Sequence, residues 1–234
     1  LVPDSAGGYT VPDEFVRQLV QKLEEENVMR QISTVRESIS GDSLIPVEAD
    51  IGDAQWTGEA QQYHESDVEF DRVTIGAHKL TRITKVSEEL MQDSFLEIES
   101  YMAGVFGRAF GRAEERAMVI GDGSGKPTGI VGRSQQGIEV AAAAITGDDL
   151  IDLQHALRRP YRAGAVWLMH DSTVKLVRKL KDDNGQYIWE PGLKAGEPDR
   201  LLNAPVYVSD HMPTVQAGAK SILYGDFAYY WILV

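Results

Sequence analysis

The sequence has 234 residues, enough for one large domain or two small ones, and its apolar (43%) and charged (25%) fractions are typical of a soluble globular protein. It contains no cysteine, which excludes disulfides and thiolate zinc sites. Its formal net charge of -13 argues against a protein that reads DNA, unless the basic residues gather on one face, but not against one that encloses DNA.

Residues 12–30 are predicted to form an amphipathic helix, because apolar side chains recur at three- and four-residue spacing from Phe15 to Leu23. Pro12 suits the first helical position. The preceding GGYTV is expected to be an extended arm. No apolar run approaches the length of a membrane span, and the opening LVPDSAGG lacks the basic flank and apolar stretch of a signal peptide.

The next segment is unusually acidic, with ten Asp or Glu residues between Glu37 and Asp71 and no Lys or Arg. A strand is predicted over residues 43–49. Residues 68–86 are predicted to form one long strand, or two strands joined at a bulge, because the alternation of apolar residues slips in phase near Leu80.

The residues between these two strands are mostly polar, with Ile51, Trp56 and Tyr63 as the sizeable apolar groups. We expect a two-stranded ribbon with an acidic tip. Such a ribbon has no face of its own to bury, so it must lie on its own domain or on a neighbour. A disordered acidic loop is the alternative, and Trp56 and Tyr63 count against it.

A long helix is predicted over residues 94–120. Ser94 and Glu97 form a capping-box pattern, and Gly121 is predicted to end the helix in the left-handed conformation. Glycines interrupt the helix, and each weakens it by about 1 kcal/mol relative to alanine. A closely packed backbone or a bend should compensate at these positions, which are Gly104, Gly107 and Gly111.

Three arginines, Arg108, Arg112 and Arg116, are spaced to line one face of this helix. They could pair locally, for instance Arg112 with Glu115. Alternatively, they could form a dock for an acidic surface such as the 37–71 segment.

The glycine-rich run GDGSGKPTGI, residues 121–130, superficially resembles a phosphate-binding loop. A P-loop needs a glycine where Ile120 stands and a hydroxyl where Pro127 stands, and it opens a helix rather than closing one. We therefore interpret the run as turn chemistry and keep a nucleotide-binding enzyme as the rival hypothesis. The turn residues are Gly121, Gly123, Gly125 and Pro127.

Strands and short helices are predicted to alternate downstream, which together with the upstream elements indicates an α+β fold. The predicted elements are a strand at 137–145, a helix capped by Thr146 and Asp149 that runs to about Leu157, a strand at 165–170, a helix from Ser172 through Leu180, a turn at Asn184–Gly185, and two or three strands within 201–210 and 221–234.

No catalytic, cofactor or metal site is predicted. The five histidines are scattered without metal-ligand spacing. His170, Asp171 and Ser172 are sequence neighbours, whereas a triad needs these groups to converge from separate elements. The residues therefore favour a protein that is not an enzyme.

Several motifs in this order resemble the major capsid proteins of tailed bacteriophages or prophages, which have the Hong Kong 97-type fold. The motifs are GGYTVP, LIPVE, AQWTGE, KLTRITKVSEELMQDS, GDGSGKPTGI after a long helix, VWLMH with LKDDNGQYIW, and LLNAPVYVSD. Encapsulin nanocompartment shells share this fold and are the runner-up within the class.

The resemblance implies an allocation of parts along the chain. It implies an N-terminal arm (1–33), an extended loop that is a β-hairpin lying on a neighbouring subunit (34–75), a peripheral domain (76–138) with the spine helix (94–120), an axial domain (139–215), and a return to the peripheral domain (216–234).

The resemblance also implies self-assembly into pentamers, hexamers and an icosahedral shell that encloses DNA without reading its sequence. The expected location is the virion, after assembly in the host bacterial cytoplasm. The other partners implied are scaffold, protease or portal proteins, with no membrane. Some relatives cross-link subunits through a lysine in the extended loop, but none lies between Lys22 and Lys79 here. The candidate interface residues are Trp56, Glu59, Tyr63, Arg108, Arg112 and Arg116.

Overall fold

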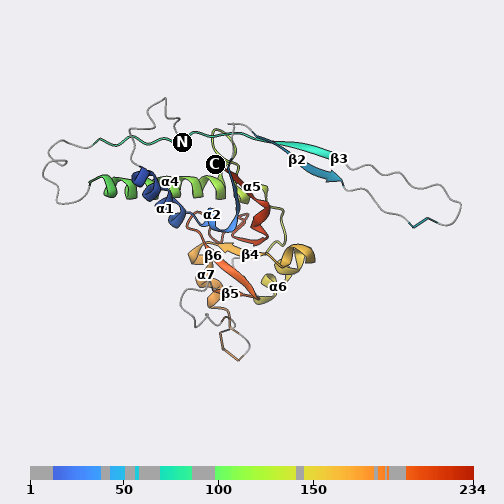
Figure 1. Ribbon diagram of the computed structural model, residues 1–234. Helices are drawn as coiled ribbons and strands as arrows, with labels where there is room; N and C mark the ends of the chain where they lie inside the picture. Colours follow the sequence, from blue (N-terminus) through green and yellow to red (C-terminus); the bar gives the residue numbers. More distant parts are fainter. Residues whose placement is uncertain are drawn as a thin grey trace. The chain divides into compact units, whose positions relative to one another are not determined.

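The computed structural model describes residues 13–37, 43–50, 56–57, 69–85, 98–140, 145–181, 184–187, 189 and 199–234. The chain divides into two compact units, one formed by Leu1–Thr34 with Lys79–Ile232, the other by Val35–His78 with Leu233–Val234. Helices and strands are mixed along the chain, as the α+β prediction requires (Figure 1).

The N-terminal helix predicted over residues 12–30 is two helices, α1 (Asp13–Glu26) and α2 (Val28–Ile32), so the single helix was wrong. The break falls at Asn27, whose backbone is extended and whose side-chain oxygen accepts a hydrogen bond from the Arg30 amide at 3.2 Å. Asparagine favours this N-cap role over a helix interior because its side chain satisfies a free amide of the next helix. Pro12 and the GGYTV arm lie outside the described residues.

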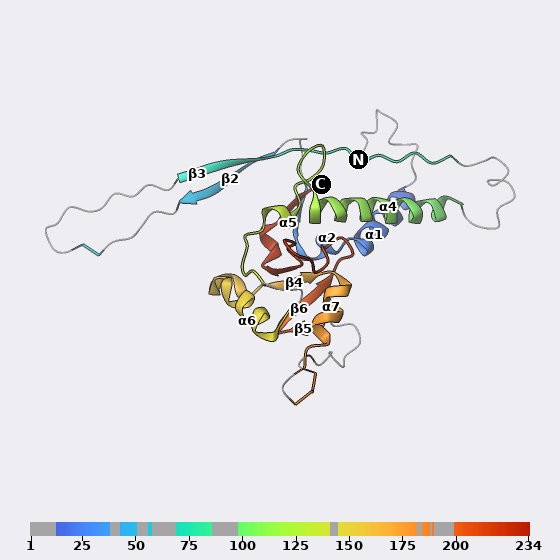
Figure 2. The ribbon, with the colours of Figure 1, turned by 180° about the vertical axis from the view of Figure 1, so that it is seen from behind.

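The long helix α4 (Ile98–Ile120) packs along α1, as the view from behind shows (Figure 2). Two of its glycines make this approach possible. A Cβ at Gly107 would lie 2.7 Å from the Leu19 carbonyl oxygen, and one at Gly111 would lie 3.0 Å from the Leu23 carbonyl oxygen. The close backbone packing expected at the glycines is therefore present at these two positions. The capping box predicted at Ser94 and Glu97 lies outside the described residues.

A four-stranded sheet in the order β5-β6-β4-β7 organises the rest of the larger unit. Strand β4 (Val166–Met169) is parallel to β6 (Ala204–Val208) and antiparallel to β7 (Ile222–Gly225). Strand β5 (Arg200–Leu201) joins β6 through a tight turn with positive φ at Leu202 and Asn203. The buried strand predicted at 165–170 is confirmed by β4. The C-terminal segments supply four strands, β5 to β8, rather than the two or three predicted. The last of them, β8 (Trp231–Leu233), pairs with β1 (Thr34–Arg36).

Two hydrophobic clusters lie on opposite faces of β4, since successive side chains of a strand point to opposite sides. Trp167 and Met169 belong to the cluster that contains Leu150 of α6 (Gly147–Ala156) and Val174 of α7 (Asp171–Arg178). Leu168, between them, belongs to the cluster that contains Met118 of α4. The Trp167 indole nitrogen donates to the Leu201 carbonyl at 2.9 Å, so the polar end of this fully buried side chain is satisfied.

The short helices next to the sheet largely follow the predictions. Helix α6 (Gly147–Ala156) begins with the expected capping box, in which Thr146 and Asp149 exchange hydrogen bonds. Helix α7 (Asp171–Arg178) covers most of the predicted 172–180 helix. Gly185 has positive φ, in a turn closed by a bridge between Lys181 and Tyr187. The remaining short elements are α5 (Ile130–Arg133), η3 (Arg159–Arg162) and η4 (Phe227–Tyr229).

The strand predicted at 137–145 is not present in its described part, since residues 137–140 and 145 are neither helix nor strand. Among the described strands, β7 and β5 occupy the two outer positions of the four-stranded sheet. Apolar residues such as Val140 remain 37% exposed, so the apolar pattern did not indicate a sheet position here.

The smaller unit contains the predicted two-stranded ribbon. Strand β2 (Ser43–Asp50) pairs antiparallel with β3 (Glu69–Ile75), from Ser43 opposite Ile75 to Asp50 opposite Glu69. The only irregularity in this ladder lies between Glu48 and Asp50, not near Leu80. The long strand predicted over residues 68–86 ends at Ile75, since residues 76–85 are neither helix nor strand.

Candidate functional site

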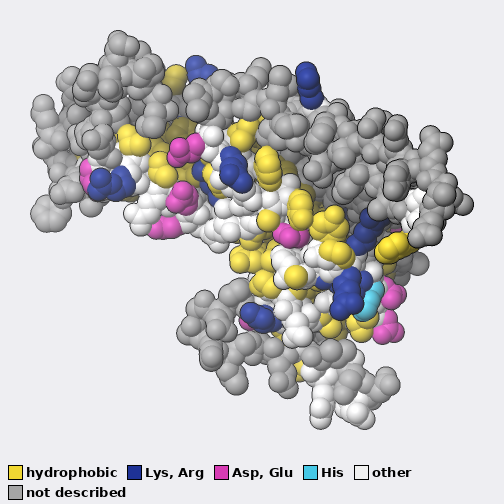
Figure 3. Space-filling view, turned by 45° about the vertical axis from the view of Figure 1, so that its right-hand side comes forward, with side chains coloured by type: hydrophobic (Ala, Val, Ile, Leu, Met, Phe, Trp, Pro, Cys, Tyr) yellow, Lys and Arg dark blue, Asp and Glu magenta, His cyan; other side chains and the backbone are white. Residues whose placement is uncertain are grey.

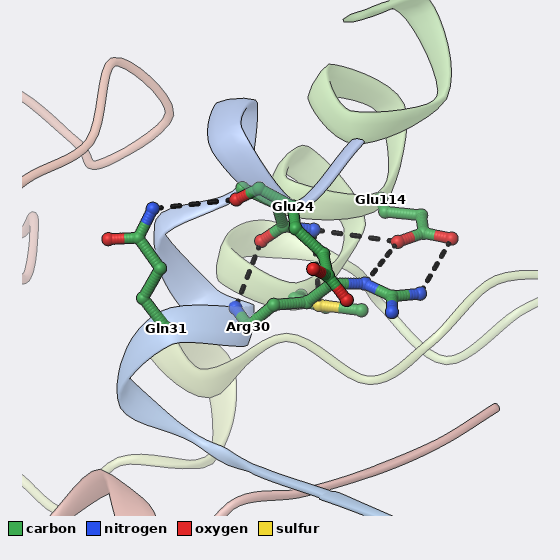
Figure 4. Close-up of polar contacts among 6 residues, drawn as sticks. Glu24, Arg30, Gln31 and Glu114 are labelled. Atoms are coloured by element: carbon green, nitrogen blue, oxygen red, sulfur yellow. Dashed lines mark hydrogen bonds and ion pairs between the residues drawn. The ribbon is translucent and has the colours of Figure 1, made fainter. Parts of the chain in front are cut away.

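The best-defined polar cluster joins the N-terminal helices to α4. Arg30 donates from Nε to Glu114 Oε2 at 3.0 Å and from Nη2 to Glu114 Oε1 at 3.3 Å (Figure 4). Asn27, which is completely buried, directs its amide nitrogen at the same carboxylate and at the Met118 sulfur. A two-pronged arginine–carboxylate pair fixes orientation as well as distance, so it holds α2 in one position on α4.

The sequence analysis did not identify this cluster. Arg30 and Glu114 are 84 positions apart, and neither stands in a motif. The available signal was Asn27, a helix-capping residue within an otherwise helical run.

The three arginines predicted to line one face of α4 have different surroundings. Arg112 Nε lies 3.3 Å from Glu26 Oε2 of α1, so its partner is not Glu115 as the local alternative proposed. Arg108 is half-buried and Arg116 is exposed. The expected dock for the acidic segment therefore has one of its three arginines already engaged within the chain.

Glu115 forms a buried hydrogen bond between α4 and another part of the chain. It is only 5% exposed and accepts a hydrogen bond from the Ser209 hydroxyl at 2.6 Å. This contact ties α4 to the loop after β6, beside a polar cavity lined by Glu26, Arg112, Asp210 and His211. Burial raises the pKa of Glu115, and the Ser209 hydrogen bond offsets only part of that rise.

The remaining interface candidates fall between β2 and β3 in the sequence. Trp56 is fully exposed to solvent, with no burial by its own chain. Glu59 and Tyr63 lie outside the described residues. An indole ring of this size that its own chain leaves in water is typical of a surface that another molecule covers.

The glycine run after α4 is a tight turn. Asp122 and Thr128 form an isolated bridge, Gly123 and Gly125 have positive φ, and Lys126 pairs with Asp122 at 3.3 Å. The Ser124 amide, which donates to the Asp122 carboxylate, is the main cause that lowers the pKa of that group. The lysine that a nucleotide site would need is thus held by an aspartate at the C-terminal end of a helix, where the helix dipole disfavours a phosphate.

Gly121 does not adopt the left-handed conformation predicted for it. Its amide still donates to the Ala117 carbonyl at 2.7 Å, as in the helix, so its backbone continues α4. A side chain there would collide with the carbonyl oxygens of Ala117 and Pro127. Glycine is required at this position by lack of space rather than by φ.

His170, Asp171 and Ser172 form a helix cap. The His170 ring nitrogen Nδ1 accepts from the Ser172 amide at 3.0 Å and lies 2.8 Å from the Ser172 hydroxyl. In the part of the chain that the structure describes, no three His, Asp or Glu side chains could together hold a metal ion. Within the same residues, no helix is long and apolar enough to cross a membrane.

Figure 3 shows Lys and Arg in small separate groups among hydrophobic side chains on the face that it draws. Several Lys and Arg side chains of the described residues are paired with carboxylates, namely Arg30, Arg112, Lys126 and Arg178.

Comparison with known proteins places this arrangement among viral shells. The model of the phage capsid family matches residues 7–233. Two curated relatives are major capsid proteins: that of Staphylococcus phage 80alpha, 23% identical over 74% of this chain and 54% of the relative, and that of Klebsiella oxytoca phage phiKO2, 23% identical over 85% and 50%. The chain thus spans about half the length of the curated relatives it matches.

Solved structures agree in fold. The capsid of a native GTA particle is 31% identical, with a TM-score of 0.78 over 99% of this chain and 84% of that one. The structure from Mycobacterium phage Cain is 18% identical, with a TM-score of 0.65 over 86% and 68%. The described helices and strands therefore form the Hong Kong 97-type fold that the sequence motifs indicated.

Proposed function

Because the chain belongs to the phage capsid family, we propose that it is a structural subunit that assembles with copies of itself into pentamers, hexamers and an icosahedral shell. The observation that carries this proposal is the β2–β3 ribbon. Two strands alone are marginally stable in water, so a folded two-stranded ribbon needs a surface to lie on.

A shell built from one kind of subunit needs contacts between different surfaces of identical molecules, repeated until they close. The exposed Trp56 beyond β2 supports such a contact, because its own chain covers none of it. We assign the ribbon segment, residues 34–75, to the extended loop that reaches a neighbour. The arm (1–33), peripheral domain (76–138 and 216–234) and axial domain (139–215) complete the proposed allocation.

The proposed role is mechanical rather than catalytic. Glu115, Arg30 and His170 all have structural partners, and the glycine turn holds its lysine in an ion pair. The shell would enclose DNA without reading it, which fits a formal net charge of -13. We place the subunit in the virion, assembled in the bacterial cytoplasm with scaffold, protease or portal proteins as further partners.

The relatives found are phage and GTA capsid proteins, so we favour this shell over an encapsulin-like nanocompartment. Electron microscopy and sizing of the purified chain, over a range of concentration and salt, test the proposal. Rings or megadalton particles are expected under some condition. A chain that stays monomeric under all of them would contradict it.

A further inference from the structure

The turn at Asn184–Gly185 is an exposed tip at which a side-chain amide precedes a glycine. Both residues are exposed, and Gly185 has a φ of 81°. The tip is closed by the bridge between Lys181 and Tyr187, where the Lys181 ammonium lies 4.9 Å from the centre of the Tyr187 ring. No atom of the described residues lies within 4 Å of the position that a side chain would take at Gly185, and no backbone hydrogen bond among these residues engages its amide. The Gly185 nitrogen is therefore open to a reaction that moves the backbone of the tip.

A side-chain amide followed by an open backbone nitrogen can react without a catalyst. The amide carbon of asparagine, Cγ, is an electrophile, and the backbone nitrogen of the next residue can close a ring on it. Any side chain on that next residue hinders the approach, so glycine is the most permissive residue to follow. The reaction needs the two residues and water alone, and it belongs to the covalent changes that alter the charge of a protein surface.

The chain contains three asparagines, and their surroundings differ. Asn27 is completely buried and precedes the β-branched Val28. Asn203 has a φ of 67° in the turn between β5 and β6, but the next residue, Ala204, is buried and paired in the sheet. The nitrogen of a buried, paired residue is held in place until the structure opens locally. Of the three asparagines, Asn184 is therefore the one that the fold leaves able to react.

Asp122 and Gly123 provide a comparison within the chain, because an aspartate before a glycine can close the same ring. The Ser124 amide donates to the Asp122 carboxylate at 2.9 Å, and the Lys126 ammonium lies 3.3 Å from it. Both contacts favour the ionised carboxylate, and the hydrogen bond from the Ser124 amide is the main cause that lowers its pKa. An ionised carboxylate is a poor electrophile, because the attacking nitrogen would have to displace an oxide. This glycine turn should therefore stay unmodified while the turn at Asn184 reacts.

We propose that Asn184 is a site of spontaneous covalent modification, at which the Gly185 backbone nitrogen displaces the side-chain amide. The Gly185 nitrogen forms a bond to Cγ of Asn184, the bond from Cγ to Nδ2 breaks, and the proton of the Gly185 amide leaves with Nδ2 as ammonia. Water then opens the cyclic imide. Addition of water at Cγ gives aspartate, whereas addition at the backbone carbonyl carbon of the same residue gives isoaspartate, in which the chain runs through the former side chain. This inference concerns the chemistry of a single chain and does not depend on the proposed shell function.

Either product changes the surface of this turn. A carboxylate replaces a neutral amide directly after Asp182 and Asp183 in the sequence, so the negative charge of this short stretch increases. In isoaspartate the backbone is also longer by a methylene group, and the turn between Lys181 and Tyr187 has to rearrange to hold it. We therefore expect modified subunits to form a distinct, more acidic population whose share increases with the age of the protein.

The test is a peptide map of the folded, unassembled chain during incubation at mildly alkaline pH, where the attacking nitrogen loses its proton more readily. Liquid chromatography with mass spectrometry separates asparagine, aspartate and isoaspartate at each position. The acidic products should accumulate at Asn184 at least about tenfold faster than at Asn27 or Asn203, because the fold holds the next nitrogen at those two positions. The rate at Asn184 should also rise with pH. An equal rate at Asn203, or isoaspartate at Asp122 before any at Asn184, would overturn the inference.

A matched pair of glycine variants identifies the attacking nitrogen. Gly185→Ala should slow the accumulation about tenfold or more, since an added methyl group hinders the approach of that nitrogen. Gly218→Ala is the control, because Gly218 is also exposed, has a φ of 74° and has no atom of the described residues within 4 Å of a side-chain position, but follows an alanine. The control should leave the rate at Asn184 within about twofold of wild type, as expected for distant, independent sites.

If Gly185→Ala reacts as fast as the wild type, another group displaces the amide, and the inference is wrong. The peptide map of the wild type decides the inference even if Gly185→Ala lowers the stability of the fold, because it uses no variant. Assembly of the chain into particles has no part in either readout, so a failure of this inference leaves the proposed shell function as it stands.

Discussion

At the scale of single residues, the glycines of α4 have different roles. Gly107 stands where α1 approaches most closely, with the Leu19 carbonyl oxygen and the Lys22 Cβ both 2.7 Å from the place of a side chain. Gly104, one turn away, has only the flexible end of Arg108 within 4 Å, at 3.5 Å. The same residue type is thus required at one position and merely tolerated at the other.

We predict that Gly107→Ala lowers the free energy of unfolding by about 1–3 kcal/mol, because the backbone of α1 would have to move. Gly104→Ala should raise it by about 0.5–1 kcal/mol, since alanine is the better helix former and has room. Urea denaturation of the two variants measures both values. Equal changes in the free energy of unfolding for the two variants would contradict close packing of α1 against α4 at Gly107.

Glu115 gives a prediction about pH. Because burial raises its pKa above the ordinary value of 4.5, the folded chain binds this proton more tightly than the unfolded chain does. Its contribution therefore stabilises the fold at acidic pH and is lost as the pH rises from about 4.5 through the folded pKa. Nearby Asp210 and Glu26 raise this pKa further and His211 lowers it.

Glu115→Gln should make the free energy of unfolding less dependent on pH in that window, removing the decrease that Glu115 contributes as the pH rises. Denaturant midpoints at half-unit steps from pH 4 to pH 8 measure the slope. Glu139→Gln, at an exposed position, is the control and should leave the slope as in wild type. A slope unaffected by Glu115→Gln would contradict a raised pKa at this carboxyl.

At this scale the sequence was informative where the interaction is local. The capping box of Thr146 and Asp149 spans three residues, so its pattern is visible in one short stretch. Gly121 was predicted to be left-handed, because glycine after a helix usually is, but its requirement comes from the Pro127 carbonyl, six residues later. Arg30 and Glu114 meet only when α2 and α4 pack, so no local pattern indicates them.

At the scale of elements, periodicity predicted type better than extent. The buried strand at β4, the α6 and α7 helices and the ribbon strands all follow from their patterns. The ends were predicted less well: β3 ends at Ile75, well before residue 86, and the N-terminal helix divides where Asn27 caps its second half. The 137–140 segment has strand-like residues but no place in the sheet.

The glycine turn after α4 allows the shell hypothesis to be tested against the nucleotide-binding hypothesis. We predict that isothermal titration calorimetry with ATP, with and without magnesium, gives no binding at micromolar concentrations. Lys126 is paired with Asp122, and the turn lies at the negative end of α4. Micromolar binding that Lys126→Ala abolishes would restore the nucleotide-binding hypothesis.

At the scale of the whole molecule, we expect Trp56 to affect assembly of the subunit but not the stability of its fold. Its complete exposure predicts that Trp56→Ala leaves the thermal midpoint of the isolated subunit within about 1 °C of wild type, since surface substitutions seldom matter. The same change should reduce the assembled fraction several-fold if a neighbouring copy buries the indole, because buried tryptophans dominate interface energetics.

Both quantities come from one preparation, by scanning calorimetry of the unassembled chain and by light scattering after assembly is induced. Val20→Ala, which truncates a side chain 41% exposed on α1, is a suitable comparison. A collapse of the subunit's own midpoint in Trp56→Ala would place the indole within its own core and remove the argument for a neighbour.

Strand β4 has a consequence for where this chain tolerates added residues. Trp167 and Met169 fill one cluster while Leu168 fills the other, so one extra residue within the strand would exchange the contents of both clusters at once. Gly185 is exposed, and no atom of the described residues lies within 4 Å of the position that a side chain would take there. Foreign peptides displayed on this protein therefore belong after Gly185, and β4 should be kept free of any insertion.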